Sequence, residues 1–381
     1  MQELIKENPV RQVSAPGPSA RRVFNFSAGP ATLPYGVMTH VQEEFLDYGG
    51  LGASIIEISH RSKDFVKVVE EATALFRELA SVPENYSILF VHGGGRMQFS
   101  GVPLNLIARR PGRIAAYVET GVFSATAIKD AGPYGDVKMI ASTREVKFVR
   151  VPDVDRASLP PDTSYVHITT NNTAYGTRWN KFPDTGDVPL VGDSTSEILS
   201  RAVDYSKFGV VYAGLQKNLG PSGTAIVVVR KDLLGLALPE TPPLLNYAVL
   251  EKGQSLVNTP STFNIYFALQ VMRWMKEIGG VAEIERRNNE KAALLYDFLD
   301  QSNFYKPFVD KAHRSTMNVT FDLPTPEALE AFLKEAGKQN LYALKGYRDV
   351  GGVRASIYNG MPKAGVEALV SFMREFERKQ G

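Results

Sequence analysis

The sequence contains no cysteine, and this absence excludes several kinds of chemistry at once. Disulfide bridges, thiolate metal sites and mechanisms that use a protein thiol cannot occur in the chain. Histidine is scarce as well. The histidines are scattered and form no HExxH pair, so we expect no metal site (His40, His60, His92, His167 and His313).

Neither sign of charge dominates, and long apolar runs are lacking. The 43 basic and 41 acidic residues give a formal net charge of +2, which provides no electrostatic case for binding nucleic acid. No apolar run approaches the ~18 residues that a membrane-spanning helix needs. The first 22 residues are polar and lack the apolar core of a secretory signal. We therefore expect a cytoplasmic protein with a mobile tail over residues 1–22. A targeting segment is the alternative, although its two glutamates count against it.

The length of 381 residues is enough for two domains. Prolines and a glycine in residues 23–35 predict an extended arm after the tail. We expect a large domain over residues 36–275 and a smaller one over residues 276–381. Apolar residues at helical spacing predict two early helices (36–48, and 62–80 with Ser62 as N-cap).

Further along the chain, short apolar runs rich in β-branched residues alternate with helical segments. This alternation predicts an α/β architecture, in which a mostly parallel sheet carries helices on both faces. The pattern then changes to a smaller α+β unit. The expected strands of the large domain are 86–92, 113–120, 147–151, 163–170, 188–193, 209–214 and 224–231, with a helix at 123–132. The smaller unit is expected to contain helices at 281–302 and 326–340 and strands at 315–323 and 353–359.

The stretch VHGGGRMQF follows one of these strands and fits two kinds of site. An HGGG loop can supply the oxyanion hole of a hydrolase, and glycines at a helix start can cradle a phosphate. A hydrolase of that kind needs a G-x-S-x-G nucleophile elbow, which the sequence does not contain. The phosphate cradle is therefore favoured.

Polar residues also follow other strands, at the edge of the sheet where ligands bind. Asp193 ends the run VPLVGD, and Lys217 follows VVYAGLQ. Alone, each is typical of a turn or of the surface. Together with the phosphate cradle they match the needs of pyridoxal phosphate chemistry. That chemistry requires a lysine to bind the cofactor, an acid to keep its ring nitrogen protonated, and a cup for its phosphate.

Six stretches are similar to motifs of one family: FNFSAGPATLP, GLGASIIEISHRSKDF, FVHGGGRMQF, YAGLQKNLGPSG, VNTPSTFNIY and LKGYRDVGGVRASIYN. From Val23 to the C-terminus the chain resembles the phosphoserine aminotransferases, which belong to the class V aminotransferases that use pyridoxal 5'-phosphate. The resemblance implies the fold-type I architecture. A large domain with a mostly parallel, seven-stranded type of sheet then carries the cofactor, a smaller α+β domain follows, and homodimers form with active sites at the subunit interface.

The resemblance also implies roles for individual residues. Lys217 becomes the Schiff-base lysine and Asp193 the partner of the ring nitrogen. Further cofactor-binding residues would be Gly95, Arg96, Phe123, Thr173 and Gln216, together with Asn258 and Thr259 contributed by the partner subunit. The substrate phosphate would be bound by His60, Arg61, Arg96 and Arg348, with Tyr347 beside them. Arg354 would bind the substrate α-carboxylate in the bidentate manner that lysine fills poorly.

Three positions depart from the family pattern. Phe123 stands where the family usually stacks a tryptophan on the cofactor ring, and phenylalanine offers less area. Tyr347 stands where the family often has a histidine, so that one possible positive charge beside the substrate phosphate is lost. Ala28 replaces a common serine, which removes one contact to the amino donor.

The expected reaction is amino transfer between glutamate and 3-phosphohydroxypyruvate, which gives 2-oxoglutarate and O-phosphoserine in serine biosynthesis. In some bacteria the family also serves vitamin B6 synthesis. Two alternatives remain at this stage. The chain could be another aminotransferase of the same fold, such as an alanine–glyoxylate or serine–pyruvate enzyme, or a dimer that binds the cofactor without catalysis.

Overall fold

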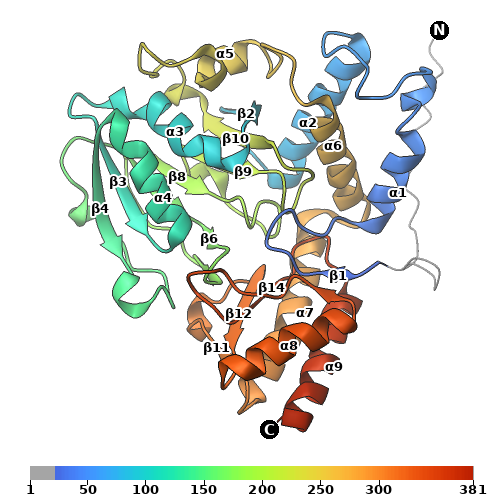
Figure 1. The fold of residues 1–381 in the computed structure, drawn as a ribbon. Coiled ribbons are helices and arrows are strands. Elements are labelled where there is room, and N and C mark those ends of the chain that lie inside the picture. Colours follow the sequence, from blue (N-terminus) through green and yellow to red (C-terminus); the bar gives the residue numbers. More distant parts are fainter. Residues whose placement is uncertain (1–21, 381) are drawn as a thin grey trace.

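A central seven-stranded sheet organises the chain in the computed structural model, which describes residues 22–380 (Figure 1). The predicted tail lies outside the described residues except for Arg22. The strand order is β2-β10-β9-β8-β5-β3-β4, and all neighbours run parallel except β10, which is antiparallel to β2 and β9. The mostly parallel sheet is thus confirmed. Its strands are β2 (Tyr86–His92), β3 (Ile114–Glu119), β4 (Asp136–Ser142), β5 (Thr163–Thr169), β8 (Leu190–Asp193), β9 (Val210–Gly214) and β10 (Thr224–Arg230).

Helices cover both faces of this sheet. Successive side chains of a strand point to opposite faces, so each face packs against its own set of helices. On β5, Val166 and Ile168 belong to one buried cluster and Tyr165 to another. The first cluster includes side chains of α1 (Tyr35–Glu44), α2 (Lys63–Ala80) and α6 (Thr262–Glu277). The second includes side chains of α3 (Gly94–Leu106), α4 (Val122–Ala131) and α5 (Tyr247–Lys252).

The second predicted helix begins as expected. The Ser62 hydroxyl accepts a hydrogen bond of 3.2 Å from the Phe65 amide, which satisfies one of the free donors at the start of α2. Asp64 adds a negative charge in the first turn, where the helix dipole favours it. The helix ends at Ala80, and Ser81 follows in the left-handed conformation. The first predicted helix is shorter than expected and ends at Glu44.

The C-terminal part forms a smaller α+β layer with its own buried cluster. The arm belongs to it, since Phe26 is part of this cluster and β1 (Phe24–Asn25) pairs in parallel with β13 (Leu341–Tyr342). Helix α7 joins both parts, because Ile284 packs in the first sheet cluster and Leu295 in the C-terminal cluster. The boundary at residues 275/276 stays a prediction. The other elements here are α7 (Gly280–Gln301), β11 (Lys306–Pro307), β12 (Asn318–Asp322), α8 (Pro326–Lys338), β14 (Val353–Ser356) and α9 (Lys363–Gln380).

Two expectations about strands were wrong. The predicted strand 147–151 is a turn, in which Lys147 and Phe148 have φ angles of 54° and 59°, outside the range of a strand. Conversely, the sequence pattern did not indicate β4. It is an edge strand whose side chains are mostly exposed, and Met139 is 56% exposed, so the apolar alternation of a half-buried strand is absent.

Candidate active site

A pocket of about 370 Å³ lies at the carboxyl ends of the parallel strands. Residues at or after the ends of β5, β8 and β9 line it, together with the starts of α3 and α4 and residues of the arm and the C-terminal part. The structure brings most of the predicted site residues together there, namely Gly95, Arg96, Phe123, Thr173, Asp193, Gln216, Lys217, Tyr347 and Arg354. Among the described residues, no group of His, Asp and Glu side chains could hold a metal ion.

Lys217 is buried in this pocket three residues after β9 ends. Its Nζ donates a hydrogen bond of 2.6 Å to Thr173 Oγ1 and lies 5.6 Å from the centre of the Phe123 ring. Burial lowers the pKa of Lys217 to about 8, while Asp193 raises it and Arg354 lowers it further. The amine therefore loses its proton more readily than a surface lysine does, which suits a nucleophile and a proton acceptor.

Asp193 is the last residue of β8 and is also buried. Burial raises its pKa, whereas hydrogen bonds from Thr195 and the charge of Lys217 lower it. One of these bonds comes from the Thr195 amide to Asp193 Oδ1 at 3.0 Å. A nearby cation stabilises the charged form of a buried carboxyl group, and a protonated ring nitrogen would be such a cation.

The start of α3 forms the predicted cradle. Gly93 is the N-cap residue with a φ angle of 81°, and the next amides lie in the first turn, where a helix leaves its N–H groups unpaired. A Cβ atom on Gly95 would lie 2.7 Å from Thr195 Oγ1 and 3.1 Å from the Gly214 amide nitrogen, so only glycine fits. Gln216 Oε1 is buried without a hydrogen-bond partner in the described part of the chain. The unpaired amides of the glycine-lined helix start fit a bound phosphate group, whereas the Gln216 oxygen can only accept from a donor.

The side chain of Arg96 is held outside the cradle. Its Nε donates to Asp130 Oδ2 on α4 at 2.9 Å, and its guanidinium lies 5.2 Å from the centre of the Phe99 ring. The side chain is 62% exposed. Its backbone amide and its guanidinium therefore face different surroundings. The two roles predicted for this residue stay predictions.

Arg354 enters the pocket from β14 and is half-buried. Its backbone amide donates to the Leu344 carbonyl oxygen at 2.8 Å, which fixes the start of the side chain. Its Nε is buried without a hydrogen-bond partner in the described chain, and burial lowers the pKa of the guanidinium. A buried donor without an acceptor is costly, so this side chain is prepared for an anion, and its fork matches a carboxylate.

Five predicted residues do not line the pocket of the single chain, namely His60, Arg61, Asn258, Thr259 and Arg348. His60 is buried and accepts a 3.4 Å bond from Arg61 Nε. Asn258 Oδ1 lies 3.1 Å from His92 Nε2, next to the glycine run. The Arg348 side chain is 92% exposed and pairs with Asp349. Their roles stay predictions.

Asn171 stands out in the sequence as a polar residue at a strand end, whereas Ser196 and Asn318, which also support the pocket, were not singled out. Asn171 Nδ2 donates to Ser196 Oγ at 2.8 Å and to Asn318 Oδ1 at 2.9 Å, which joins the loops after β5 and β8 to β12. The end of β8 is the signal for Ser196. No local signal indicates Asn318, which lies 147 residues from Asn171 in the sequence.

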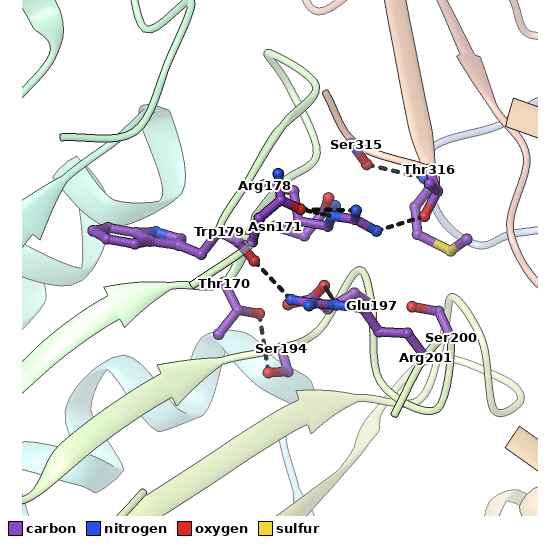
Figure 2. A network of polar contacts seen from close by, with 12 residues as sticks. Thr170, Asn171, Arg178, Trp179, Ser194, Glu197, Ser200, Arg201, Ser315 and Thr316 are labelled. Carbon is purple, nitrogen blue, oxygen red and sulfur yellow. Dashed lines mark hydrogen bonds and ion pairs between the residues drawn. The ribbon is translucent and has the colours of Figure 1, made fainter. Parts of the chain in front are cut away.

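Figure 2 shows the polar network beside these residues. Arg201 pairs with Glu197 at 3.1 Å and donates to the Trp179 carbonyl oxygen at 2.8 Å. Arg178 Nη1 donates to Thr316 Oγ1 at 3.0 Å. The network ties the segment after β8 to the C-terminal part, so the loops that carry the pocket residues have a fixed support.

Comparison with known proteins assigns the family. The Aminotransferase class-V family model matches residues 23–369. The chain belongs to the class V aminotransferases. The phosphoserine aminotransferase of Bacillus cereus is 48% identical over 356 residues, which cover 93% of this chain and 98% of the relative. That of Geobacillus kaustophilus is 47% identical, over 94% of this chain and 99% of the relative.

Solved structures of this class V family have the same fold. A phosphoserine aminotransferase from Bacillus circulans subsp. alkalophilus superposes with a TM-score of 0.92 at 43% identity, covering 95% of this chain and all of that one. The pyridoxal-phosphate-bound phosphoserine aminotransferase from Trichomonas vaginalis has a TM-score of 0.87 at 35% identity, covering 93% of this chain and all of that one. The predicted fold-type I architecture is therefore confirmed.

Proposed function

We propose that this chain transfers an amino group between glutamate and 3-phosphohydroxypyruvate, giving 2-oxoglutarate and O-phosphoserine. The names of relatives that match almost the whole chain support this reaction. The arrangement of one pocket carries the proposal. A buried amine at Lys217, a buried carboxyl at Asp193, a glycine-lined helix start and the guanidinium of Arg354 with its unpartnered Nε all line it.

The residues present fit pyridoxal phosphate. This cofactor supplies an electron sink for the charge that develops at the substrate Cα. Lys217 would bind it covalently, and the Asp193 carboxylate would pair with its ring nitrogen. The amides of Gly95 and Arg96 would hold its phosphate, with Gln216 beside them.

The chain's own groups then orient the substrate and move its proton. Arg354 binds the substrate α-carboxylate through its fork of donors. Nζ of Lys217, once freed by the substrate amine, would accept the proton from the substrate Cα and would deliver it to the cofactor. Its lowered pKa allows both steps near neutral pH.

Recognition of the substrate phosphate is assigned to His60, Arg61, Arg96 and Arg348, with Tyr347 at the rim. Most of them lie outside the pocket of a single chain, so we propose that a homodimer completes the site and contributes Asn258 and Thr259 from the partner subunit. An apolar groove of about 660 Å³ supports the homodimer, because a partner subunit would cover this apolar surface. It runs along α1 and α6, and Leu46 at its edge is 80% exposed.

The proposed location of this homodimer is the cytoplasm. No helix in the described part of the chain is long and apolar enough to cross a membrane.

The alternatives receive less support. An alanine–glyoxylate aminotransferase from Nostoc shares 18% identity with a TM-score of 0.73, and this likeness shows the fold alone. Such an enzyme would not need the residues assigned to the substrate phosphate. A protein that only binds the cofactor would not need a guanidinium such as that of Arg354, whose unpartnered Nε is ready for a substrate carboxylate.

The proposal is tested with the purified holoenzyme and two amino donors. We expect turnover of O-phosphoserine with 2-oxoglutarate, weak turnover of alanine with glyoxylate, and no turnover by Lys217→Ala. Lys138→Ala removes a lysine from the exposed β4 and serves as the control with full activity. A preference for alanine, or full activity of Lys217→Ala, would overturn the proposal.

A further inference from the structure

Tyr358 follows β14 and is fully buried, yet its hydroxyl reaches the edge of the pocket. It donates a hydrogen bond of 2.8 Å to the carbonyl oxygen of Ala28, a residue of the arm that lines the pocket. It also accepts a hydrogen bond of 3.1 Å from Asn318 Nδ2 on β12. One phenol therefore holds the arm and the C-terminal sheet together beside the active site.

Thr173, the hydrogen-bond partner of Lys217, also influences this hydroxyl. A hydrogen-bond contribution from Thr173 lowers the pKa of Tyr358, although burial raises that pKa overall. Because the proton of Tyr358 is committed to the Ala28 carbonyl, Tyr358 can only accept from Thr173. Thr173 Oγ1 for its part accepts the 2.6 Å bond from Lys217 Nζ.

Lys291 on α7 anchors the backbone of Tyr358. Its Nζ is buried and donates to the carbonyl oxygens of Ile357 at 2.9 Å, Tyr358 at 2.7 Å and Met361 at 3.1 Å. An ammonium group has three donors, so this arrangement uses all of them. The next residue, Asn359, donates its amide to Asn218 Oδ1 at 3.1 Å. The segment is thereby attached beside Lys217 as well.

We propose that Tyr358 is a positioning residue for the transfer reaction. It fixes the Ala28 carbonyl at the pocket wall and accepts a hydrogen bond from the Thr173 hydroxyl, so that a lone pair of Thr173 Oγ1 is left for Lys217. Lys291 acts through Tyr358 by holding its backbone. This inference rests on the proposed function of the site. None of the roles implied by the family resemblance falls on these two residues.

The first test is kinetic and uses a matched pair of variants. Tyr358→Phe removes the hydroxyl and keeps the ring. The control, Tyr305→Phe, removes a buried hydroxyl that donates at 2.9 Å to the Met373 carbonyl oxygen inside the C-terminal cluster. For Tyr358→Phe we expect the KM of both amino donors to rise roughly fivefold, with a smaller change in kcat, which is the effect of one lost hydrogen bond. Tyr305→Phe should leave both constants unchanged.

The second test does not depend on any substrate. In the full chain without cofactor, the rate at which an amine-directed reagent labels Lys217 is followed against pH, with peptide mass spectrometry to locate the label. The charged groups that face Lys217 are Asp193 from β8 and Arg354 from β14, and both remain in the variant. Without the Tyr358 hydroxyl, Thr173 is free to donate to the neutral amine. The midpoint of labelling should therefore fall by roughly half a pH unit in Tyr358→Phe and stay in place in Tyr305→Phe.

Lys291→Met, which keeps most of the length of the side chain and removes its donors, should change both measurements in the same direction. Unchanged KM values and an unchanged labelling midpoint in Tyr358→Phe would overturn the inference. Recovery of both variants only in unfolded form would overturn it too, since the residues would then be structural. Failure of the proposed substrate would not move the labelling result, so the two claims can be told apart.

Discussion

The rings of Phe123 and Tyr347 meet edge to face at the pocket, with centroids 6.3 Å apart and planes inclined by 62°. Phe123 comes from α4, and Tyr347 from the loop between β13 and β14. The sequence singled out both positions separately as departures from the family pattern. Their contact shows that the two departures form one wall of the pocket, on the side where Lys217 Nζ lies 5.6 Å from the Phe123 ring.

Because the two rings support each other, their substitutions should not act independently. We expect Phe123→Ala and Tyr347→Ala each to raise the KM for O-phosphoserine. The loss of binding free energy in the double variant should be smaller than the summed losses of the two single variants. The difference should be about 0.5–1.5 kcal/mol, the usual value for an aromatic pair. Steady-state kinetics of all four proteins gives this coupling. Strict additivity would mean that the rings act on the substrate separately.

Arg354→Lys tests the assignment of the α-carboxylate. A lysine keeps the charge and loses the fork, so we expect the KM values of O-phosphoserine and glutamate to rise together, by roughly tenfold or more. Arg314→Lys is the control, since this partly buried arginine forms a fork with Asp300 outside the pocket. A loss confined to O-phosphoserine would instead assign Arg354 to the substrate phosphate.

The subunits are expected to complete each other's sites. Lys217→Ala is mixed under exchange conditions with a chain in which Asn258 and Thr259 are both replaced by alanine. Each parent should be inactive or nearly so, whereas random pairing restores about one quarter of the sites. Recovered activity after mixing, together with a dimer mass, checks the prediction. An active monomer would refute it.

The sequence predicted much of the site, because the residues that carry the chemistry lie at the ends of apolar strands. Lys217, Asp193 and Gly95 were found from that position and from their chemical types, and the structure places them in one pocket. Tyr358 gave no such signal, because its contact with Ala28 spans 330 residues of sequence and involves a backbone carbonyl group. The edge strand β4 was missed because exposure removes the alternation of apolar and polar residues.

Lys217 should make the stability of the chain without cofactor depend on pH. Burial lowers its pKa from 10.5 to about 8, so the unfolded chain binds more protons than the folded chain between these values. The free energy of unfolding contributed by this group therefore rises with pH across that window, by at most about 1.4 kcal/mol per pH unit. Denaturant titrations at pH 8, 8.5 and 9 give the free energy of unfolding at each pH. This free energy should rise less steeply with pH for Lys217→Met than for the wild type. Equal slopes would show that Lys217 keeps an ordinary pKa in the fold.

The central claim is that Lys217, Asp193 and Arg354 serve an amino transfer from O-phosphoserine. A single half-reaction tests it most directly. The holoenzyme is mixed with O-phosphoserine in the absence of any 2-oxo acid, and both the visible absorbance of the cofactor and the released product are measured. We predict loss of the visible band and about one equivalent of 3-phosphohydroxypyruvate per subunit, as the first half of a transfer requires. An unchanged band with O-phosphoserine, alongside a complete change with alanine, would contradict the account.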